Sequence, residues 1–235
     1  DMTWREISAA EPVTGNPGVT SANSVYGNAV VGVATTTGGT AAYQSRVTLG
    51  REASNVISGN SGNGIAVIGG SSNTIAMNQI GTDAAGTSAV PNSLNGILLT
   101  RSASGNTIGG SATANNDPTA GVFARPPQGN LISGNRSNGV AIVGGATANT
   151  LMGNFIGTTD SGNEPLGNAR DGVAISGADS NALLGTTFQQ SPFVFYNVLA
   201  GNGGNGLRLT DSDNTTVQAN FMGTAADNAT AVPNG

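Results

Sequence analysis

The sequence offers very few side chains that could act as a nucleophile or a base. Its 235 residues include no histidine, no cysteine and no lysine, and all eight basic residues are arginine. Imidazole, thiolate and amine groups supply most catalytic nucleophiles, general bases and soft-metal ligands. Carboxylate and guanidinium groups remain as the candidates. We therefore expect no catalytic residue and no cofactor, and the sequence favours a protein that is not an enzyme.

Three aspartates recur inside a repeated twelve-residue segment. The segment reads GTDAAGTSAVPN at 81–92, GTTDSGNEPLGN at 157–168 and GTAADNATAVPN at 223–234. Its third, fourth and fifth positions, respectively, hold Asp83, Asp160 and Asp227. Because these positions differ, solvated turn carboxylates are the favoured interpretation. The alternative is that the three segments are interaction loops, which bind a receptor or a second copy of the chain.

Other charged side chains give only weak signals for a site. Asp211 and Asp213, in the run DSDN, are weak calcium candidates, because the run lacks the glycine and the distant glutamate of an EF-hand loop. We therefore predict no metal site. Arg101, Arg170 and Arg208 follow or border predicted strands. Lining of a glycan groove is one interpretation, and edge charges that discourage unwanted sheet pairing are the simpler one.

Two short frames account for most of the remaining chain. The first is Asn-x-apolar-x-x-Asn, whose clear copies begin at Asn23, Asn55, Asn73, Asn130, Asn149 and Asn197. Looser copies begin at Arg5, Asn106, Asn181 and Thr215. The second frame is Asn or Asp, then Gly, then apolar-x-apolar; it begins at Asn63, Asn95, Asn138, Asp171 and Asn205, and SRVTL at Ser45 holds the same slot. Repeats of this kind indicate a solenoid.

Both frames have the pattern of short strands. Apolar residues alternate with small or polar ones, as at Ile65 and Val67, and Gly or Asn-Gly separates the runs. Such strands bury their apolar face only when neighbouring turns stack and pair their backbones. We predict an all-β fold, a parallel β-helix of about ten coils. Its core column would contain Ile57, Ile75, Ile108, Ile132, Leu151, Leu183, Leu199 and Val217.

The asparagines of the first frame have a specific interpretation. In a stacked coil, equivalent side chains lie about 4.8 Å apart and can hydrogen-bond along a ladder. One predicted ladder contains Asn60, Asn78, Asn135, Asn154, Asn202 and Asn220, and a second contains Asn55, Asn73, Asn106, Asn130, Asn149, Asn181 and Asn197. The alternative is that each asparagine only fills a turn position with positive φ.

The twelve-residue segments are expected to leave the coil as outward loops. The same sequence separation relates Asn55 to Asn106 and Asn130 to Asn181, which predicts one enlarged coil in every three. The loops would then lie roughly 14 Å apart, whereas glycosidase carboxylates need about 5–9.5 Å. A positive φ is expected at the sixth loop position, which holds Gly86, Gly162 and Asn228.

The repeats resemble those of a known fold. With NTIGG at 106–110, NVISGN at 55–60 and IGTDAAGT at 80–87, the chain resembles the right-handed parallel β-helix repeats of very large bacterial surface and secreted proteins, which share the fold of pectate lyases. The resemblance covers nearly all of the chain and implies an extracellular or cell-surface location. Lyases of this fold use acidic clusters around calcium with an Arg or Lys base, and related galacturonases use grouped aspartates. No matching cluster is recognised, and the fold alone does not imply an activity.

We expect residues 1–235 to form one β-helix domain, with residues 1–22 as degenerate first coils. Asn234-Gly235 stops about two residues before the next strand is due, and no helical or charged cap is evident at either end. The sequence therefore predicts a chain that ends mid-repeat. It would be either a fragment of a longer protein or a unit that stacks end to end on further copies.

Two functions are consistent with these observations. The leading hypothesis is a non-catalytic extracellular scaffold: a stalk, an adhesin segment or a fibre subunit. The alternative is a carbohydrate-binding or polysaccharide-degrading β-helix, with its site in the irregular coils at 120–128 and 188–196. The expected partners are other copies, the remainder of a larger polypeptide, or glycans. A net charge of −5 argues against nucleic acid, and no apolar run approaches the roughly 20 residues of a membrane span.

Overall fold

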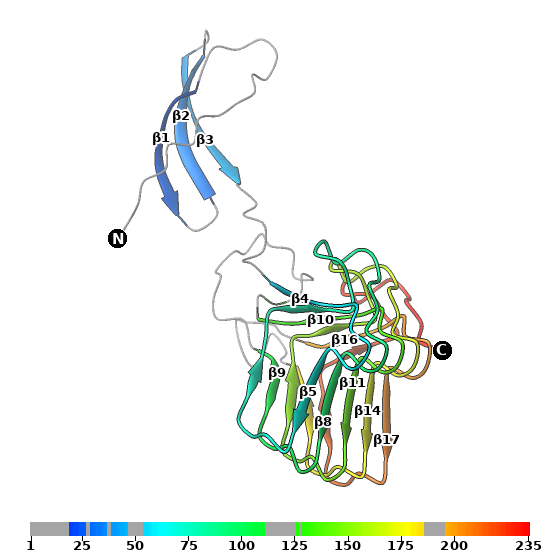
Figure 1. Cartoon of the computed structure of the whole chain (residues 1–235). Coiled ribbons are helices and arrows are strands. Elements are labelled where there is room, and N and C mark those ends of the chain that lie inside the picture. Colours follow the sequence, from blue (N-terminus) through cyan, green and yellow to red (C-terminus); the bar gives the residue numbers. More distant parts are fainter. Residues whose placement is uncertain are drawn as a thin grey trace. The chain divides into compact units, whose positions relative to one another are not determined.

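The chain divides into two compact units, residues 1–53 and residues 54–235 (Figure 1). The computed structural model describes the backbone at 19–26, 29–36 and 39–46, and then residues 54–110, 126, 128–185 and 196–235.

The first unit contains a three-stranded antiparallel sheet. Its strands are β1 (Val19–Tyr26), β2 (Ala29–Thr36) and β3 (Gly39–Arg46), in the order β1-β2-β3. The coils predicted from the frame at Asn23 and the slot at Ser45 are therefore wrong, since both lie on antiparallel strands. The reason is the length of the connections. Two residues separate neighbouring strands here, and a connection this short joins antiparallel strands only.

The second unit is a parallel β-helix of about six coils. Each coil passes through three parallel sheets in turn. The first sheet consists of β4 (Asn55–Ile57), β7 (Asn78–Ile80), β10 (Leu131–Ile132), β13 (Phe155–Ile156), β16 (Val198–Leu199) and β19 (Phe221–Met222). The second consists of β5 (Ile65–Ile68), β8 (Ile97–Thr100), β11 (Val140–Val143), β14 (Val173–Ser176) and β17 (Leu207–Thr210). The third consists of β6 (Thr74–Ile75), β9 (Thr107–Gly109), β12 (Thr150–Met152), β15 (Ala182–Leu184) and β18 (Thr216–Gln218).

Pairing joins each strand to the one three places along the chain, as Figure 1 shows for β5, β8, β11, β14 and β17. This arrangement confirms the predicted all-β parallel coil. The estimate of about ten coils was too high for a simple reason. It counted each six-residue frame as one coil, whereas the frames at Asn55 and Asn73 belong to the first and third sheets of the same coil.

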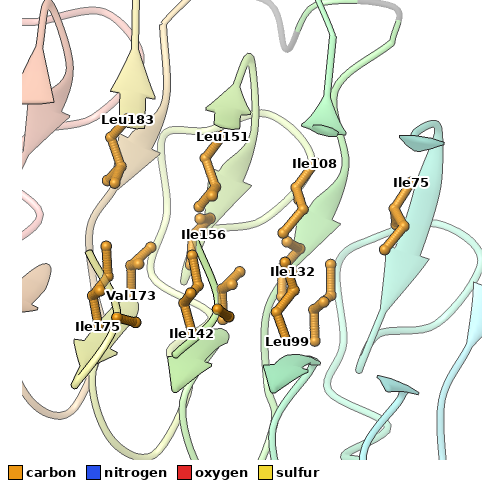
Figure 2. Close-up of a cluster of buried hydrophobic side chains, with 14 of the residues drawn as sticks. Ile75, Leu99, Ile108, Ile132, Ile142, Leu151, Ile156, Val173, Ile175 and Leu183 are labelled. Carbon is orange, nitrogen blue, oxygen red and sulfur yellow. The ribbon is translucent and has the colours of Figure 1, made fainter. Parts of the chain in front are cut away.

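The core lies inside the coil, where apolar side chains from all three sheets meet (Figure 2). The predicted column is in fact two. The first sheet holds Ile57, Ile132 and Leu199, and the third holds Ile75, Ile108, Leu151, Leu183 and Val217. Val217, on the last strand of the third sheet, is exposed, so its predicted place in the core is wrong. The second sheet adds the buried residues Ile97, Leu99, Val140, Ile142, Val173 and Ile175. Each such side chain contributes about 1.5–3 kcal/mol of transfer free energy. Packing from coil to coil therefore stabilises strands that are only two to four residues long.

Truncation inside this core should be costly. We expect Ile142→Ala to lower the free energy of unfolding by about 2–5 kcal/mol, because the fully buried side chain leaves a cavity between coils. Ile68→Ala is the matched control in the same sheet, since Ile68 is 59% exposed, and it should change stability by less than about 0.5 kcal/mol. Urea unfolding followed by circular dichroism measures both. Equal losses in the two variants would contradict this placement of the core.

Candidate functional site: asparagine corners and stacked hairpins

Asparagine side chains fill the corners between the sheets and form ladders. The first ladder lies at the start of the strands of the first sheet and contains Asn55, Asn78, Asn130, Asn154, Asn197 and Asn220. The second follows the first sheet and contains Asn60, Asn92, Asn135, Asn168, Asn202 and Asn234. The third precedes the third sheet and contains Asn73, Asn106, Asn149 and Asn181. In all three, each Nδ2 donates to the Oδ1 of the next coil.

Asn154 illustrates why the corner requires this side chain. Its Nδ2 donates to Asn197 Oδ1 at 3.0 Å and to the carbonyl oxygen of Ile108 at 2.9 Å. Its Oδ1 accepts hydrogen bonds from the backbone N–H and the Nδ2 of Asn130, at 3.1 and 2.9 Å. The residue is fully buried. A carboxamide has two donors and two acceptor sites, so it satisfies both its own polar atoms and those of the turning backbone.

The structure confirms that asparagine ladders exist and corrects their membership. The predicted ladder is divided: Asn78, Asn154 and Asn220 belong to the first ladder, and Asn60, Asn135 and Asn202 to the second. The second predicted ladder is likewise divided between the first and third. The reason is that the same six-residue frame occurs twice in one coil. The copy that begins at Asn55 spans the first sheet, and the copy that begins at Asn73 spans the third. Sequence reasoning missed Asn92, Asn168 and Asn234, although each is the last residue of a twelve-residue segment.

A fourth ladder precedes the second sheet and has the opposite direction. Its members, from the first coil onwards, are Asn63, Asn95, Asn138, Asp171 and Asn205. Here Nδ2 donates to the Oδ1 of the preceding coil, as from Asn95 to Asn63 at 3.0 Å. This ladder lies on the second sequence frame, which was predicted to mark strands but not to form a ladder.

Asp171 is the acidic member of the fourth ladder. It is only 5% exposed, and its Oδ1 accepts hydrogen bonds from the N–H and Nδ2 of Asn205. Its Oδ2 accepts one from Arg208 Nε at 2.7 Å. Burial by itself would raise the pKa of Asp171, but the hydrogen bonds from Arg208 and Asn205 outweigh it and hold that pKa below its ordinary value. Arg208, predicted as an edge charge or a groove residue, is thus the ion-pair partner of a ladder residue.

The twelve-residue segments are β-hairpins that each follow a strand of the first sheet. Each is closed by an antiparallel bridge: Thr82 with Ala89, Thr158 with Pro165, and Thr224 with Ala231. They follow β7, β13 and β19, which are alternate strands of the first sheet. The predicted spacing of one loop in every three coils is therefore wrong. The hairpins recur every second coil, roughly 10 Å apart along the axis.

Neighbouring hairpins contact each other at their tips. The N–H of Asp160 donates to the carbonyl oxygen of Gly86, and that of Ala226 to Gly162, both at 2.9 Å. The φ values at the sixth position are positive, 67° for Gly86, 75° for Gly162 and 54° for Asn228, which confirms the prediction. Gly162 has a second reason to be glycine. A Cβ there would lie 2.5 Å from Phe155 Cε2 and 2.6 Å from Ala226 Cβ.

The hairpins cover a second apolar cluster on the outer face of the first sheet. It consists of Leu131, Phe155, Tyr196, Val198, Ala200, Ala225, Ala226 and Val232, with Phe221 partly buried beside it. The rings of Tyr196 and Phe221 stack with centroids 4.3 Å apart. Burial raises the pKa of Tyr196 to about 12. The first sheet is therefore buried on both faces wherever a hairpin covers it.

The hairpin aspartates are placed as turn carboxylates. The Asp83 carboxylate accepts hydrogen bonds from the N–H groups of Thr87 and Ser88, and these hold its pKa below the ordinary value. In the third hairpin, the N–H and hydroxyl of Thr230 and then the N–H of Ala229 lower the pKa of Asp227. Asp160 contributes its backbone to the tip contact. A binding role for these loops stays a prediction.

The remaining candidate residues are not brought together. Asp211 is exposed with a φ of 46°, and the N–H of Asp213 donates to Asp179 Oδ1. Among the described residues, no group of three or more His, Cys, Asp or Glu side chains is arranged to hold a metal ion. Arg101 and Arg170 are exposed.

The irregular coils at 120–128 and 188–196 lie almost entirely outside the described residues, apart from Pro126, Gln128 and Tyr196. The part of the chain that the structure describes contains no helix long and apolar enough to cross a membrane.

Comparison of the chain with protein-family models, with curated proteins and with solved structures gives no match. The parallel β-helix assignment therefore rests on strand pairing and on the ladders.

Removal of one ladder side chain should destabilise the coil. We expect Asn154→Ala to lower the free energy of unfolding by about 1–3 kcal/mol, because it removes the hydrogen bonds that Asn154 makes with the buried backbone N–H of Asn130 and with the carbonyl oxygen of Ile108. Asn163→Ala, at an exposed hairpin position, is the matched control. Chemical denaturation of the two variants tests this, and a neutral Asn154→Ala would show that the ladder does not stabilise the coil.

Stability should also fall in acid. The pKa values of Asp83, Asp171 and Asp227 are lowered by folding, so their contribution is present above the ordinary value of 3.8 and is lost as pH falls through the lower folded-state values. We expect the free energy of unfolding to decrease between about pH 5 and pH 2. In Asp171→Asn this decrease should be smaller. An unchanged acid dependence in that variant would exclude Asp171 as a contributor.

Proposed function

We propose that this chain is a non-catalytic structural segment of an extracellular or cell-surface protein, such as a stalk, an adhesin segment or part of a fibre. Its role is to supply length and rigidity. The observation that carries this proposal is the continuity of the ladders and of the core from coil to coil. The core and the first two ladders run through all of the described coils, so neither feature singles out one coil as a site.

Rigidity follows from the number of bonds that must break together. Two neighbouring coils share backbone pairing in three sheets, and the corner ladders add buried side-chain hydrogen bonds. Bending or opening between two coils would break several of these at once and leave buried polar groups unpaired. Each added coil lengthens the unit by about 4.8 Å without changing the others.

Because the hairpins recur every second coil, the repeating element of the β-helix is a pair of coils. Their tips bond across an intervening coil that has no hairpin, and the apolar cluster fills the space between. A segment built in this way presents hairpin tips at regular intervals along one side. These tips are the surface that we assign to contacts with a receptor or with other copies.

We therefore expect the β-helix to remain folded when it is shortened by two coils at a time. Deletion of residues 130–196 joins Gly129 to Asn197 and removes one pair. The variant should fold and unfold cooperatively, because the remaining hairpins stay two coils apart. Spin labels at Ile68→Cys and Thr210→Cys, four coils apart in the same column, should move from roughly 19 Å to roughly 10 Å apart.

Deletion of residues 130–153, a single coil, is the control. It places two hairpin coils directly on each other, where the tips cannot keep their present contact, so it should be clearly less stable than the paired deletion. A glycan array and a lyase assay on uronate polymers with calcium complete the test. Turnover at enzymic rates would reject the scaffold and favour the carbohydrate-active alternative.

A further inference from the structure

The strands of the second sheet are nearly interchangeable. They begin within the motifs NGIAV, NGILL, NGVAI, DGVAI and NGLRL. The positions that face the core hold only Ile, Val or Leu. Backbone pairing and core packing therefore discriminate poorly between the right neighbour and a wrong one. Repeat proteins are prone to misassembly of this kind during folding.

The hairpins remove only part of this ambiguity. They distinguish coils with a hairpin from coils without one, but the coils of β8 and β14 both carry a hairpin. The coil of β17 could therefore stack on the coil of β8 instead of the coil of β14. Such a product would leave out the two coils between them.

Arg208 distinguishes these two neighbours. In the native stack it lies opposite Ala174, whose small side chain lets the guanidinium reach Asp171 Oδ2 at 2.7 Å. In the wrong stack the equivalent ladder residue is Asn95, which has no carboxylate, and the residue opposite Arg208 is Leu98. The charge would then lose its partner.

Asp171 weakens its own ladder, which indicates that stability is not its main contribution. A carboxylate cannot donate, so Asn138 Oδ1 receives only the backbone N–H of Asp171, at 3.1 Å. At the two preceding steps of this ladder, Nδ2 also donates. Asparagine would restore that bond and remove the ion pair.

We propose that the Asp171–Arg208 pair selects the stacking order of the coils, by favouring β17 beside β14 over β17 beside β8. The ion pair lowers the free energy of the first arrangement relative to the second, and the two arrangements otherwise form similar backbone hydrogen bonds. The Asp171 side chain is 7% exposed and that of Arg208 is 48% exposed, and in some proteins polar and ionic groups of this kind fix the register while adding little stability.

Engineered cysteines can report the stacking order, because the chain has none of its own. Thr210 is paired with Ser176 in the native register, so Ser176→Cys with Thr210→Cys should form a disulfide on refolding. Thr100 occupies the same column three coils from Thr210, roughly 14 Å away. Thr100→Cys with Thr210→Cys can therefore form an intramolecular disulfide only in the wrong stack.

The experiment measures the 100–210 disulfide after dilute refolding from urea under oxidising conditions. Asp171→Asn and Arg208→Gln, each added to this pair of cysteines, should raise the crosslinked monomer about two- to fivefold. The urea midpoint of Asp171→Asn should stay the same or increase. Arg170→Gln, an exposed arginine beside Asp171 in the sequence, is the control and should leave the yield unchanged.

Three results would overturn the proposal. They are an unchanged crosslink in both Asp171→Asn and Arg208→Gln, an equal increase in Arg170→Gln, or a lower urea midpoint in Asp171→Asn that accounts for the increase. The Ser176–Thr210 cysteine pair shows in each background that the native register can be trapped.

Discussion

The second unit depends on how a coil changes direction without leaving buried polar groups unpaired. At each corner the backbone leaves one sheet and enters the next, so its N–H and C=O groups lose the regular pairing of the strands. The carboxamides at these corners supply what is missing. Asn154 and Asn135 each bond to the coils on both sides and to a backbone carbonyl. Short strands are stable here because the corners are as fully bonded as the sheets.

The hairpins add a second layer with a different period. The core and ladders repeat with every coil, whereas the hairpins and the cluster beneath them repeat with every second coil. Gly86 and Gly162 allow the hairpins to pack on the coils, because their positive φ and their lack of a Cβ let each hairpin tip lie against the next. The same glycines allow Leu131 and Phe155 to be buried on the outer face of the first sheet.

Much of this arrangement follows from local signals in the sequence. Alternation of apolar and small residues predicted the strands, recurrence predicted stacking, and the position of Gly86 in its loop predicted its φ. The predictions that failed are those that depend on how the chain runs between one motif and the next. The motif NTIAMN resembles NVISGN, yet one lies in the third sheet and the other in the first, and sequence alone gives no reason to separate them. Residues 19–46 have similar alternation, but short connections make their sheet antiparallel. The partnership of Asp171 and Arg208 requires knowing that β14 and β17 are neighbours.

The directions of the four ladders have an electrostatic consequence. Every side-chain amide is a dipole, and in a ladder these dipoles align head to tail along the coil axis, much as peptide groups do in a helix. In three ladders the N–H end points towards the C-terminal coils, and in the fourth it points the other way. The opposed ladder cancels only part of the sum, so the asparagines give the coil an axial field whose positive pole faces its C-terminal end.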